Sequence, residues 1–393
     1  MPEPFRILTL NSISACGLER FAPRRYEVGP KIDNPDAILL RSFDMHNMGI
    51  PESVLAIARA GAGTNNIPVA KMTSHGIPVF NTPGANANAV KELVLAAMLM
   101  GARNLIPAIK FAESLEGVDI GKQVEEGKKA FAGSELPGHT LGIIGLGAIG
   151  RLVAETALRL GMNVMGYDPE ITVDAAWGLP SQVVRAYSVE ALLKASDFVT
   201  LHVPLLDSTR NLIDAKRLSV MKKSAILLNF ARDGIVDEDA VIAALEARKI
   251  KSYICDFPGE KLKGRQGVVA FPHLGASTRE AEDNCAVMAA SQVMDYLEHG
   301  NILNTVNFPN LEMARESNYR IAIVNANVPN MLGQISTAFA GAGINIHNMA
   351  NKSRGEIAYT LVDIDSPASS PVIEQIASIP GVVRVRDLAL RHE

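Results

Sequence analysis

The chain of 393 residues is 48% hydrophobic and 20% charged, with a net charge of −4 at pH 7. These values are ordinary for a globular protein of two or three domains, and they indicate neither nucleic acid nor an anionic membrane as a general partner. Three scattered cysteines, the lack of a signal-peptide pattern and the lack of a long apolar stretch predict a cytoplasmic protein without a disulfide framework or a metal site.

Residues 1 to about 90 have the pattern of a small α/β unit. Strands are expected at Phe5–Leu10, Ala37–Leu40, 54–60 and 77–80. The turns that follow three of these strands contain Arg41-Ser42, Gly61-Ala62-Gly63-Thr64-Asn65 and Asn81-Thr82-Pro83-Gly84. Because ligands collect outside the carboxyl ends of strands in open α/β sheets, these turns are candidate substrate loops. Ordinary surface connections without a ligand are an open alternative.

A long apolar helix pattern over residues 89–104 is expected to connect this unit to the next domain. The following stretch, 113–138, is polar and carries Lys122, Lys128 and Lys129, so we expect a solvated loop and helix there.

The stretch from residue 141 to Asp168 has the pattern of a dinucleotide-binding unit. An apolar run at 141–144 predicts a buried strand, which continues directly into a G-x-G-x-x-G turn, Gly145-Leu146-Gly147-Ala148-Ile149-Gly150. A helix pattern follows to Leu160, with Gly161 at the position of a left-handed cap, and then a second strand at Asn163–Tyr167. The three glycines allow a tight turn, close approach to a pyrophosphate and close packing of the helix on the strand.

Asp168 completes this pattern. It follows Gly150 by 18 residues (168 − 150), near the spacing at which a carboxylate binds the adenosine ribose hydroxyls. The carboxylate would repel a 2′-phosphate, and Pro169 and Glu170 offer no cation to hold one. The sequence therefore favours NAD over NADP.

Alternating strands and helices continue after this unit and predict a doubly wound parallel sheet. Strands are expected at Phe198–Leu201, 226–228, 253–255 and 268–271, with helices at Val189–Ala195 and 239–248 and with Asp237 capping the second helix. Directly after these strands stand His202, Arg232, Asp256 and His273. They are expected at the edge of the sheet where the nicotinamide end of a dinucleotide would lie.

Three of the charged or ionisable side chains in this region fit oxidation of a 2-hydroxy acid. Arg232 can hold a carboxylate with two parallel hydrogen bonds, and His273 can move the hydroxyl proton because imidazole titrates near neutral pH. Glu260 could accept the other ring N–H of His273 and raise its pKa. Asp256 could accept a hydrogen bond from the nicotinamide carboxamide. His202 is expected to border the cofactor without taking part in the chemistry. A surface ion pair for Arg232 and a packed turn histidine for His273 are the open alternatives.

The last part of the chain predicts a separate unit. A helix over 282–299 is long enough to return to the first domain, and the polar stretch 301–318 is interpreted as a linker. From Tyr319 the pattern is β-α-β-β-α-β, the ferredoxin-like arrangement, without an evident catalytic cluster. A binding or regulatory role is therefore expected for it.

Four stretches together resemble the D-2-hydroxyacid dehydrogenase family: LGIIGLGAIG at 141–150, LHVPL at 201–205, NFARDGIVDE at 229–238 and PHLGAST at 272–278. The C-terminal unit is similar to an ACT domain. The resemblance implies an α/β protein with a Rossmann-type NAD domain (91–282), a flavodoxin-like substrate domain (1–90 with 283–305) and a ferredoxin-like ACT domain (319–393).

The resemblance also implies a set of site residues. The catalytic residues would be Arg232, Glu260 and His273. The cofactor contacts would be Gly145, Gly147, Ala148, Ile149, Gly150, Asp168, His202, Pro204, Ala231 and Asp256. The substrate contacts would be Arg41, Ser42, Asn86 and Arg232, with Lys128 or Lys129 from a neighbouring subunit.

The substrate implied by the resemblance is a phosphorylated 2-hydroxy acid, D-3-phosphoglycerate, oxidised with NAD to 3-phosphohydroxypyruvate. L-Serine would bind between two ACT domains at Asn325, Asn327 and Asn345, in a homodimer or homotetramer. Three alternatives stay open: a reductase of hydroxypyruvate or another D-2-hydroxyacid, a non-catalytic NAD-sensing protein, and an amino-acid sensor with a vestigial enzyme.

Overall fold

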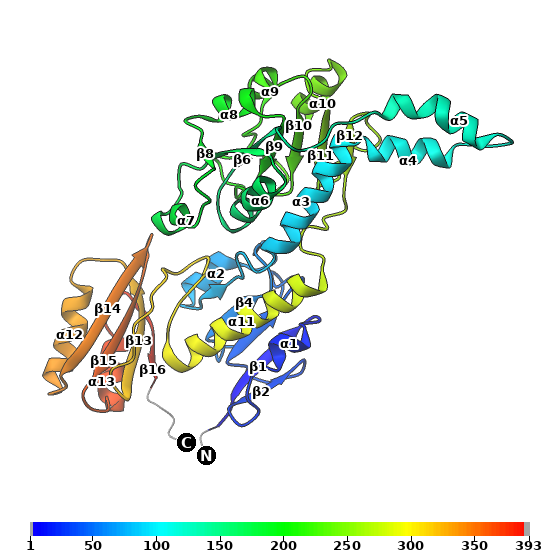
Figure 1. Ribbon diagram of the computed structural model, residues 1–393. Coiled ribbons are helices and arrows are strands. Elements are labelled where there is room, and N and C mark those ends of the chain that lie inside the picture. Colours follow the sequence, from blue (N-terminus) through cyan, green and yellow to red (C-terminus); the bar gives the residue numbers. More distant parts are fainter. Residues whose placement is uncertain (1–2, 389–393) are drawn as a thin grey trace. The chain divides into compact units, whose positions relative to one another are not determined.

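The computed structural model describes residues 3–388, so the first two and the last five residues of the expected domains lie outside it. The chain divides into two compact units. The split unit consists of Met1–Ala85 and Glu282–Glu393, and the central unit of Asn86–Ala281. Figure 1 labels the elements of both.

The split unit begins with a parallel sheet of strand order β2-β1-β3-β4-β5. Its strands are β1 (Phe5–Leu10), β2 (Tyr26–Gly29), β3 (Ala37–Leu40), β4 (Ala56–Arg59) and β5 (Val79–Phe80), with helices α1 (Ala15–Leu18) and α2 (Val69–Ser74). The expected strands are present, although β4 and β5 are shorter than predicted. The edge strand β2 was not predicted, because its short sequence YEVG has neither an apolar run nor a clear alternation.

Helix α11 (Arg279–His299) contributes Ala289, Val293, Tyr296 and Leu297 to the core of the split unit. The segment 301–318 is not the free linker that its polar composition suggested. Ile302 and Phe308 are buried in the same core, and Ile302 pairs with Leu311 in an antiparallel bridge. A few apolar side chains therefore hold this segment against the unit despite its polar remainder.

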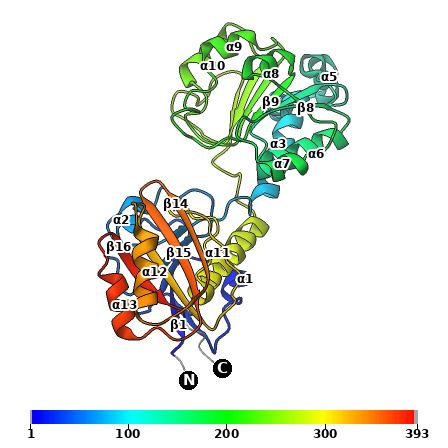
Figure 2. The same cartoon turned by 90° about the vertical axis from the view of Figure 1, so that its left-hand side faces the viewer.

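The C-terminal part of the split unit has the expected β-α-β-β-α-β order. It consists of β13 (Tyr319–Ala326), α12 (Met331–Gly341), β14 (Ile346–Arg354), β15 (Ile357–Ile364), α13 (Ser370–Ala377) and β16 (Val382–Asp387). The antiparallel sheet has the order β14-β15-β13-β16, and α12 and α13 cover one of its faces (Figure 2).

Both faces of this antiparallel sheet are buried. Along β13, Ile321 and Ile323 pack under α12 and α13, whereas Ala322 and Val324 belong to the same core as Tyr296 of α11. This alternation follows from the two-residue period of a strand. One core cluster of the split unit therefore joins its N-terminal and C-terminal segments.

Two arginines of β16 strengthen this junction. Arg384 donates to the carbonyl oxygens of Glu52 and Val54 at 3.1 and 2.7 Å. Arg386 donates to the carbonyl oxygens of Tyr296 and Leu297, and its guanidinium lies 4.5 Å from the ring centroid of Tyr296. Guanidinium groups suit this task because they present several donors in one plane and stack on aromatic rings.

The central unit is a doubly wound parallel sheet of strand order β12-β11-β10-β9-β6-β7-β8, which confirms the predicted fold. The strands are β6 (Thr140–Ile144), β7 (Asn163–Tyr167), β8 (Val184–Arg185), β9 (Phe198–Leu201), β10 (Ile226–Asn229), β11 (Ser252–Cys255) and β12 (Val268–Ala270). The strand order reverses between β6 and β9, the place where such sheets open a crevice for a ligand.

Helices cover both faces of this sheet. They are α3 (Ala87–Ala102), α6 (Ala148–Arg159), α7 (Val173–Trp177), α8 (Val189–Ala195), α9 (Ala215–Val220) and α10 (Glu238–Glu246). Helices α3 and α6 pack on one face, and α8, α9 and α10 on the other. Asp237 caps α10 as predicted, since its carboxylate accepts the N–H of Ala240 at 3.0 Å.

An arm extends from the end of α3 in the central unit (Figure 1). It consists of α4 (Leu105–Glu113), α5 (Ile120–Gly127) and the 3₁₀ helix η1 (Lys128–Phe131), where the sequence predicted a solvated loop and helix. Phe111 and Phe131 pack together, but Ile109 and Val118 are 53% and 87% exposed. Between residues 3 and 388 no single helix has the length and composition of a membrane span; α3 and α4 reach that composition only as a pair bent by 65°.

Candidate active site

Each glycine of the predicted fingerprint has a separate structural reason. Gly145 has a φ of +93°, and a Cβ there would lie 2.5 Å from the carbonyl oxygen of His202. A Cβ on Gly150 would overlap the carbonyl oxygen of Gly145. A Cβ on Gly147 would meet no atom within 4 Å among the described residues. The space beside Gly147 is therefore open, as expected where a pyrophosphate approaches the backbone.

Asp168 lies at the end of β7 and binds this turn directly. Its carboxylate accepts the backbone N–H of Leu146 at 2.8 Å and that of Glu170 at 3.0 Å. Helix α6 begins after Gly147 with Ala148 and Ile149, and in the part of the chain described here no side chain caps its first turn. The open space at Gly147, the free N–H groups of α6 and the carboxylate at the end of the next strand together fit the phosphates and ribose of NAD.

His202 follows β9 and supports the same turn. Its backbone N–H donates to Ile144, and its Nε2 lies 3.0 Å from the hydroxyl of Thr200. Burial lowers the pKa of His202 from 6.5 to about 3, so the ring is neutral at physiological pH. Nδ1 is buried and has no hydrogen-bond partner within residues 3–388. Pro204, two residues on, receives the Thr209 hydroxyl on its carbonyl oxygen.

Arg232 stands just beyond the carboxyl end of β10 and is exposed. The buried Asn229 holds the backbone around it, because the Asn229 amide donates to the carbonyl oxygen of Arg232 at 2.9 Å and accepts the N–H of Ala231 at 3.2 Å. Asn229 was not predicted as a site residue. A polar residue at the end of the buried run Ile226–Asn229 was the available signal.

Asp256 follows β11 and fixes the loop that carries His273. Its two carboxylate oxygens accept the N–H groups of Leu274 and Gly275, both at 2.7 Å, and its carbonyl oxygen accepts the N–H of His273 at 3.1 Å. Burial raises the pKa of Asp256, while the two N–H groups and His273 oppose that rise. This positioning role was not predicted, since the sequence analysis gave Asp256 only a cofactor contact.

His273 itself is exposed and has a left-handed backbone, with a φ of +56°. Such a conformation is uncommon for a residue with a side chain, and it occurs preferentially at functional sites. The ring packs edge-on against Phe257 at a centroid distance of 5.1 Å. The described residues include no hydrogen bond or ion pair between His273 and Glu260, so the support that Glu260 would give the histidine stays a prediction.

Glu260 lies in an exposed turn whose neighbours are held by other groups. Lys261 forms an ion pair with Asp239 at 2.8 Å, and Gly259 packs so closely on the Glu238 carboxylate that a Cβ would overlap it. Burial and the nearby Asp233 raise the pKa of Glu238, whereas Lys261 lowers it.

The candidate substrate loops lie at the carboxyl ends of the strands in the split unit. Arg41 follows β3 and forms an ion pair with Glu282 at 2.7 Å, and Ser42 beside it is exposed. Arg59, at the end of β4, joins two of the loops, because its guanidinium donates to the carbonyl oxygens of Arg41 and Gly63. The sequence analysis did not predict a role for Arg59. Its position at the end of β4 was the available signal, because Arg41 was selected for its position directly after β3.

The remaining predicted contacts lie elsewhere. Asn86 precedes α3 in the central unit and, in residues 3–388, makes no capping hydrogen bond. Lys128 and Lys129 lie in the arm, where Lys128 is paired with Glu125. No group of three or more possible metal ligands occurs among the described side chains.

The three predicted effector residues do not meet within one chain. The amide of Asn325 is buried and bonded to Ala326, and that of Asn327 is bonded to Gly355. The strand register puts Asn345 at the opposite end of the sheet, beside Asp365. A site that contains all three would need a second copy of the chain.

Comparisons with known proteins agree with this geometry. A family model described as the NAD-binding domain of D-isomer-specific 2-hydroxyacid dehydrogenases matches residues 95–276. A protein named D-3-phosphoglycerate dehydrogenase from Haemophilus influenzae is 35% identical over 85% of this chain and 81% of its own length. The chain belongs to the D-isomer-specific 2-hydroxyacid dehydrogenase family.

Two further comparisons support this assignment. D-3-phosphoglycerate dehydrogenase 1 of Saccharomyces cerevisiae is 30% identical over 97% of this chain and 87% of its own length. A crystal structure of NAD⁺-bound 3-phosphoglycerate dehydrogenase from Entamoeba histolytica is 26% identical, with a TM-score of 0.61, and covers 79% of this chain and 100% of that one. The predictions of the family, of NAD as the cofactor and of an NAD-dependent dehydrogenase are confirmed.

Proposed function

We propose that this chain oxidises D-3-phosphoglycerate to 3-phosphohydroxypyruvate with NAD, the first step of L-serine biosynthesis. The proposal rests on the similarity to proteins named D-3-phosphoglycerate dehydrogenase, which extends over 85% of the chain at 35% identity. The arginine and the histidine that such an oxidation needs stand at the carboxyl edge of the parallel sheet that also carries the glycine turn.

The reaction needs three tasks from the protein's own residues. Arg232 binds the substrate carboxylate through its guanidinium, which stays charged at any physiological pH. The imidazole of His273 takes the proton of the C2 hydroxyl as the C–H bond breaks. Asp256 keeps the histidine in position through the N–H groups of Leu274 and Gly275. NAD, when bound, accepts the hydride from C2.

We assign the substrate phosphate to the loops around Arg41 and Ser42. Arg59 braces these loops through backbone carbonyl oxygens. One observation favours a second candidate function, reduction of an unphosphorylated acid such as hydroxypyruvate. Arg41 is already paired with Glu282, so a phosphate has to compete with that carboxylate.

Oxidation of NADH with 3-phosphohydroxypyruvate and with hydroxypyruvate, measured side by side, separates the two candidates. We expect a large preference for the phosphorylated acid. Arg41→Gln should raise KM for the phosphorylated acid and leave KM for hydroxypyruvate nearly unchanged. Arg25→Gln, an arginine paired with Glu298 in the same unit, is the matched control. Equal rates with both acids would reassign the enzyme as a general reductase, and no rate with either would favour an NAD-sensing protein.

We also propose that the C-terminal β-α-β-β-α-β segment is an ACT domain that binds L-serine across two copies of the chain. The separation of Asn345 from Asn325 and Asn327 within one copy supports a shared site. L-Serine should lower the rate of NADH oxidation, and Asn345→Ala should remove that inhibition without changing the rate in its absence. Inhibition that survives the substitution would rule out this site.

We also propose that the chain forms a homodimer or homotetramer and that it is cytoplasmic. The exposed apolar side chains of the arm, Leu105, Ile109, Val118 and Ile120, support a partner surface there. Light scattering after size-exclusion chromatography should give twice or four times the mass of one chain. Ile109→Glu should reduce that mass, and an unchanged mass would exclude the arm as the interface.

A further inference from the structure

A basic cavity of about 680 Å³ lies in the central unit, at the edge of the sheet opposite to the glycine turn. Its walls come from helix α10 and from the three loops that precede β10, β11 and β12. The glycine turn follows the carboxyl end of β6, whereas these loops lead into the amino ends of their strands. In parallel strands these are opposite edges, so the cavity is separate from the dinucleotide site.

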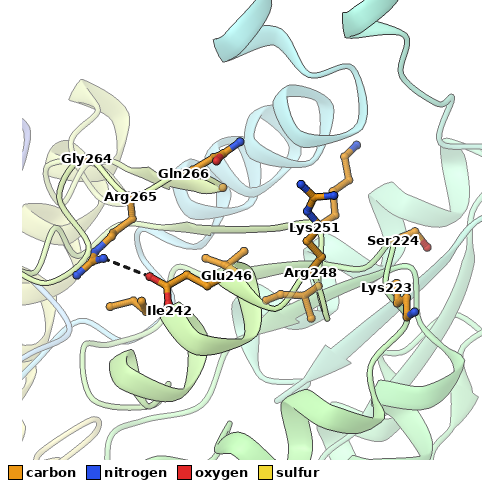
Figure 3. Close-up of a pocket in the computed structure, with 12 residues that line it drawn as sticks. Lys223, Ser224, Ile242, Glu246, Arg248, Lys251, Gly264, Arg265 and Gln266 are labelled. Carbon is orange, nitrogen blue, oxygen red and sulfur yellow. Dashed lines mark hydrogen bonds and ion pairs between the residues drawn. The ribbon is translucent and has the colours of Figure 1, made fainter.

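Each of the three loops brings a positive charge to the cavity. Lys223 precedes β10, Arg248 and Lys251 precede β11, and Arg265 precedes β12 (Figure 3). The only acidic residue that lines it is Glu246, which is paired with Arg265 at 3.3 Å. The other three cations have no carboxylate partner in residues 3–388, so the cavity carries an excess of positive charge.

Two of these cations are held in place by the surrounding structure. Arg248 follows the end of α10 with a φ of +52°, a conformation that glycine adopts at lower cost. The Nζ of Lys251 donates to the carbonyl oxygen of Gly101 at 2.9 Å, and burial lowers the pKa of this amine. A bound anion would favour the charged form of Lys251 and would accept hydrogen bonds from the guanidinium of Arg248.

The rest of the lining narrows the class of ligand. Ile242, Leu245 and Ile250 provide aliphatic surface beneath the cations, which suits the carbon skeleton of a small molecule. The volume is in the range of small-molecule sites. Cations on three separate loops match negative charge spread over several groups better than a single carboxylate.

We propose that this cavity binds a small phosphorylated molecule with at least two negative charges. Lys223, Arg248 and Lys251 bind the ligand. Arg265 lies in the same lining, where its ion pair with Glu246 fixes its position. Because the cavity lies away from the dinucleotide site, the ligand binds together with NAD and does not compete with it.

Isothermal titration of the full chain with inorganic pyrophosphate, in the presence of saturating NAD⁺, tests the proposal. NAD⁺ keeps the probe from the glycine turn. We expect a site that remains in Arg41→Gln, and is therefore separate from the loops assigned to the substrate phosphate, and an increase in the melting temperature with pyrophosphate concentration. Citrate should bind more weakly than pyrophosphate. Tighter binding of citrate, or no saturable binding of pyrophosphate at about 1 mM, would overturn the proposal.

Two neighbouring substitutions provide the matched comparison. Arg248→Gly removes the cation and relieves the left-handed backbone, so it should weaken pyrophosphate binding about tenfold or more without lowering the melting temperature. Lys249→Ala removes the same charge one residue away, outside the cavity lining, and should change binding less than about twofold. Equal effects of the two would mean general charge attraction and overturn the site. If Arg248→Gly does not fold, Lys251→Gln takes its place. It should likewise weaken pyrophosphate binding about tenfold or more.

Discussion

The carboxylate of Asp256 lies 2.7 Å from the backbone nitrogen of Gly275 and holds the loop that presents His273. The other carboxylate oxygen accepts the N–H of Leu274 at the same distance. A buried carboxylate with two backbone donors thus fixes a histidine whose own backbone is left-handed.

Asp256→Asn should lower turnover and stability together. An amide has one acceptor oxygen, so its NH₂ group would face a backbone N–H, and an unpaired buried donor costs about 1–3 kcal/mol. We expect a lower kcat and a lower melting temperature with little change in the dissociation constant of NAD. The control is Asp214→Asn. Asp214 caps the N-terminus of α9, and asparagine is an equally good N-cap residue. A variant with normal kcat would contradict the positioning role.

His273→Ala should reduce kcat by about 10² to 10⁴, the usual contribution of general acid–base catalysis. NAD binding, followed by protein fluorescence, should be unchanged, because the glycine turn is not altered. His139→Ala serves as the comparison in the same unit. Turnover that survives the change at His273 would assign proton transfer to another group.

Substitutions at two glycines of the same turn should have opposite consequences. Gly150→Ala should disrupt the unit, because the added methyl group overlaps the carbonyl oxygen of Gly145. Gly147→Ala should leave the melting temperature unchanged but weaken NAD binding about tenfold, or about 1.4 kcal/mol. Melting curves and NAD titrations of both variants test this, and normal NAD binding by Gly147→Ala would exclude close approach of the cofactor at that residue.

His202 should make the protein less stable in mild acid. Its pKa is about 3 in the folded protein and about 6.5 in the unfolded chain, so below pH 6.5 the unfolded chain binds a proton that the folded protein does not. The free energy of unfolding should fall by up to about 1.4 kcal/mol per pH unit as the pH drops through this range.

The measurement is the difference in melting temperature between about pH 7 and about pH 5, for the wild type and for His202→Gln. The glutamine variant should lose less stability on acidification than the wild type. His75→Gln, at an exposed position of the split unit, should behave like the wild type. An unchanged difference in His202→Gln would show that other groups cause the acid sensitivity.

Arg320→Ala should be strongly destabilising. Arg320 and Asp363 form an ion pair at 2.6 Å with both side chains fully buried, and breaking such a pair costs about 3–5 kcal/mol. Arg320→Ala/Asp363→Ala should not recover the loss, since Arg320 also donates to the carbonyl oxygens of His299, Met313 and Ala314. Urea unfolding of both variants tests this. Arg159→Ala, which breaks an exposed pair with Glu155, should cost less than about 1 kcal/mol.

Much of the fold follows from local sequence signals. The buried strand Ala37–Leu40 is a continuous apolar run, and Phe198–Leu201 is apolar except for Thr200; such runs are typical of parallel sheets with both faces covered. The glycine turn was predictable because its G-x-G-x-x-G spacing lies between a strand pattern and a helix pattern. In contrast, the short strand Tyr26–Gly29 forms through pairing with β1, and its own sequence gives no such signal.

The site was less predictable because backbone positions decide it. The sequence predicted Arg232 and His273 as site residues from their type and from their place after strands. Asn229, Arg59 and the loop-holding role of Asp256 were missed, since these side chains act on backbone atoms of loops whose conformation the sequence does not show. The polar segment 301–318 was interpreted as a linker for a related reason. Its composition does not reveal that Ile302 and Phe308 are buried in the core of the split unit.

The discontinuity of the split unit has a consequence for biosynthesis. The ribosome completes residues 86–281 before it makes α11, β13 and β15, which supply much of the core around β1 and β3. The N-terminal strands must therefore remain without their final packing partners while the central unit is already able to fold. A nascent chain arrested when residue 281 has just left the ribosomal exit tunnel should expose its N-terminal segment to a protease, whereas its central segment should be protected.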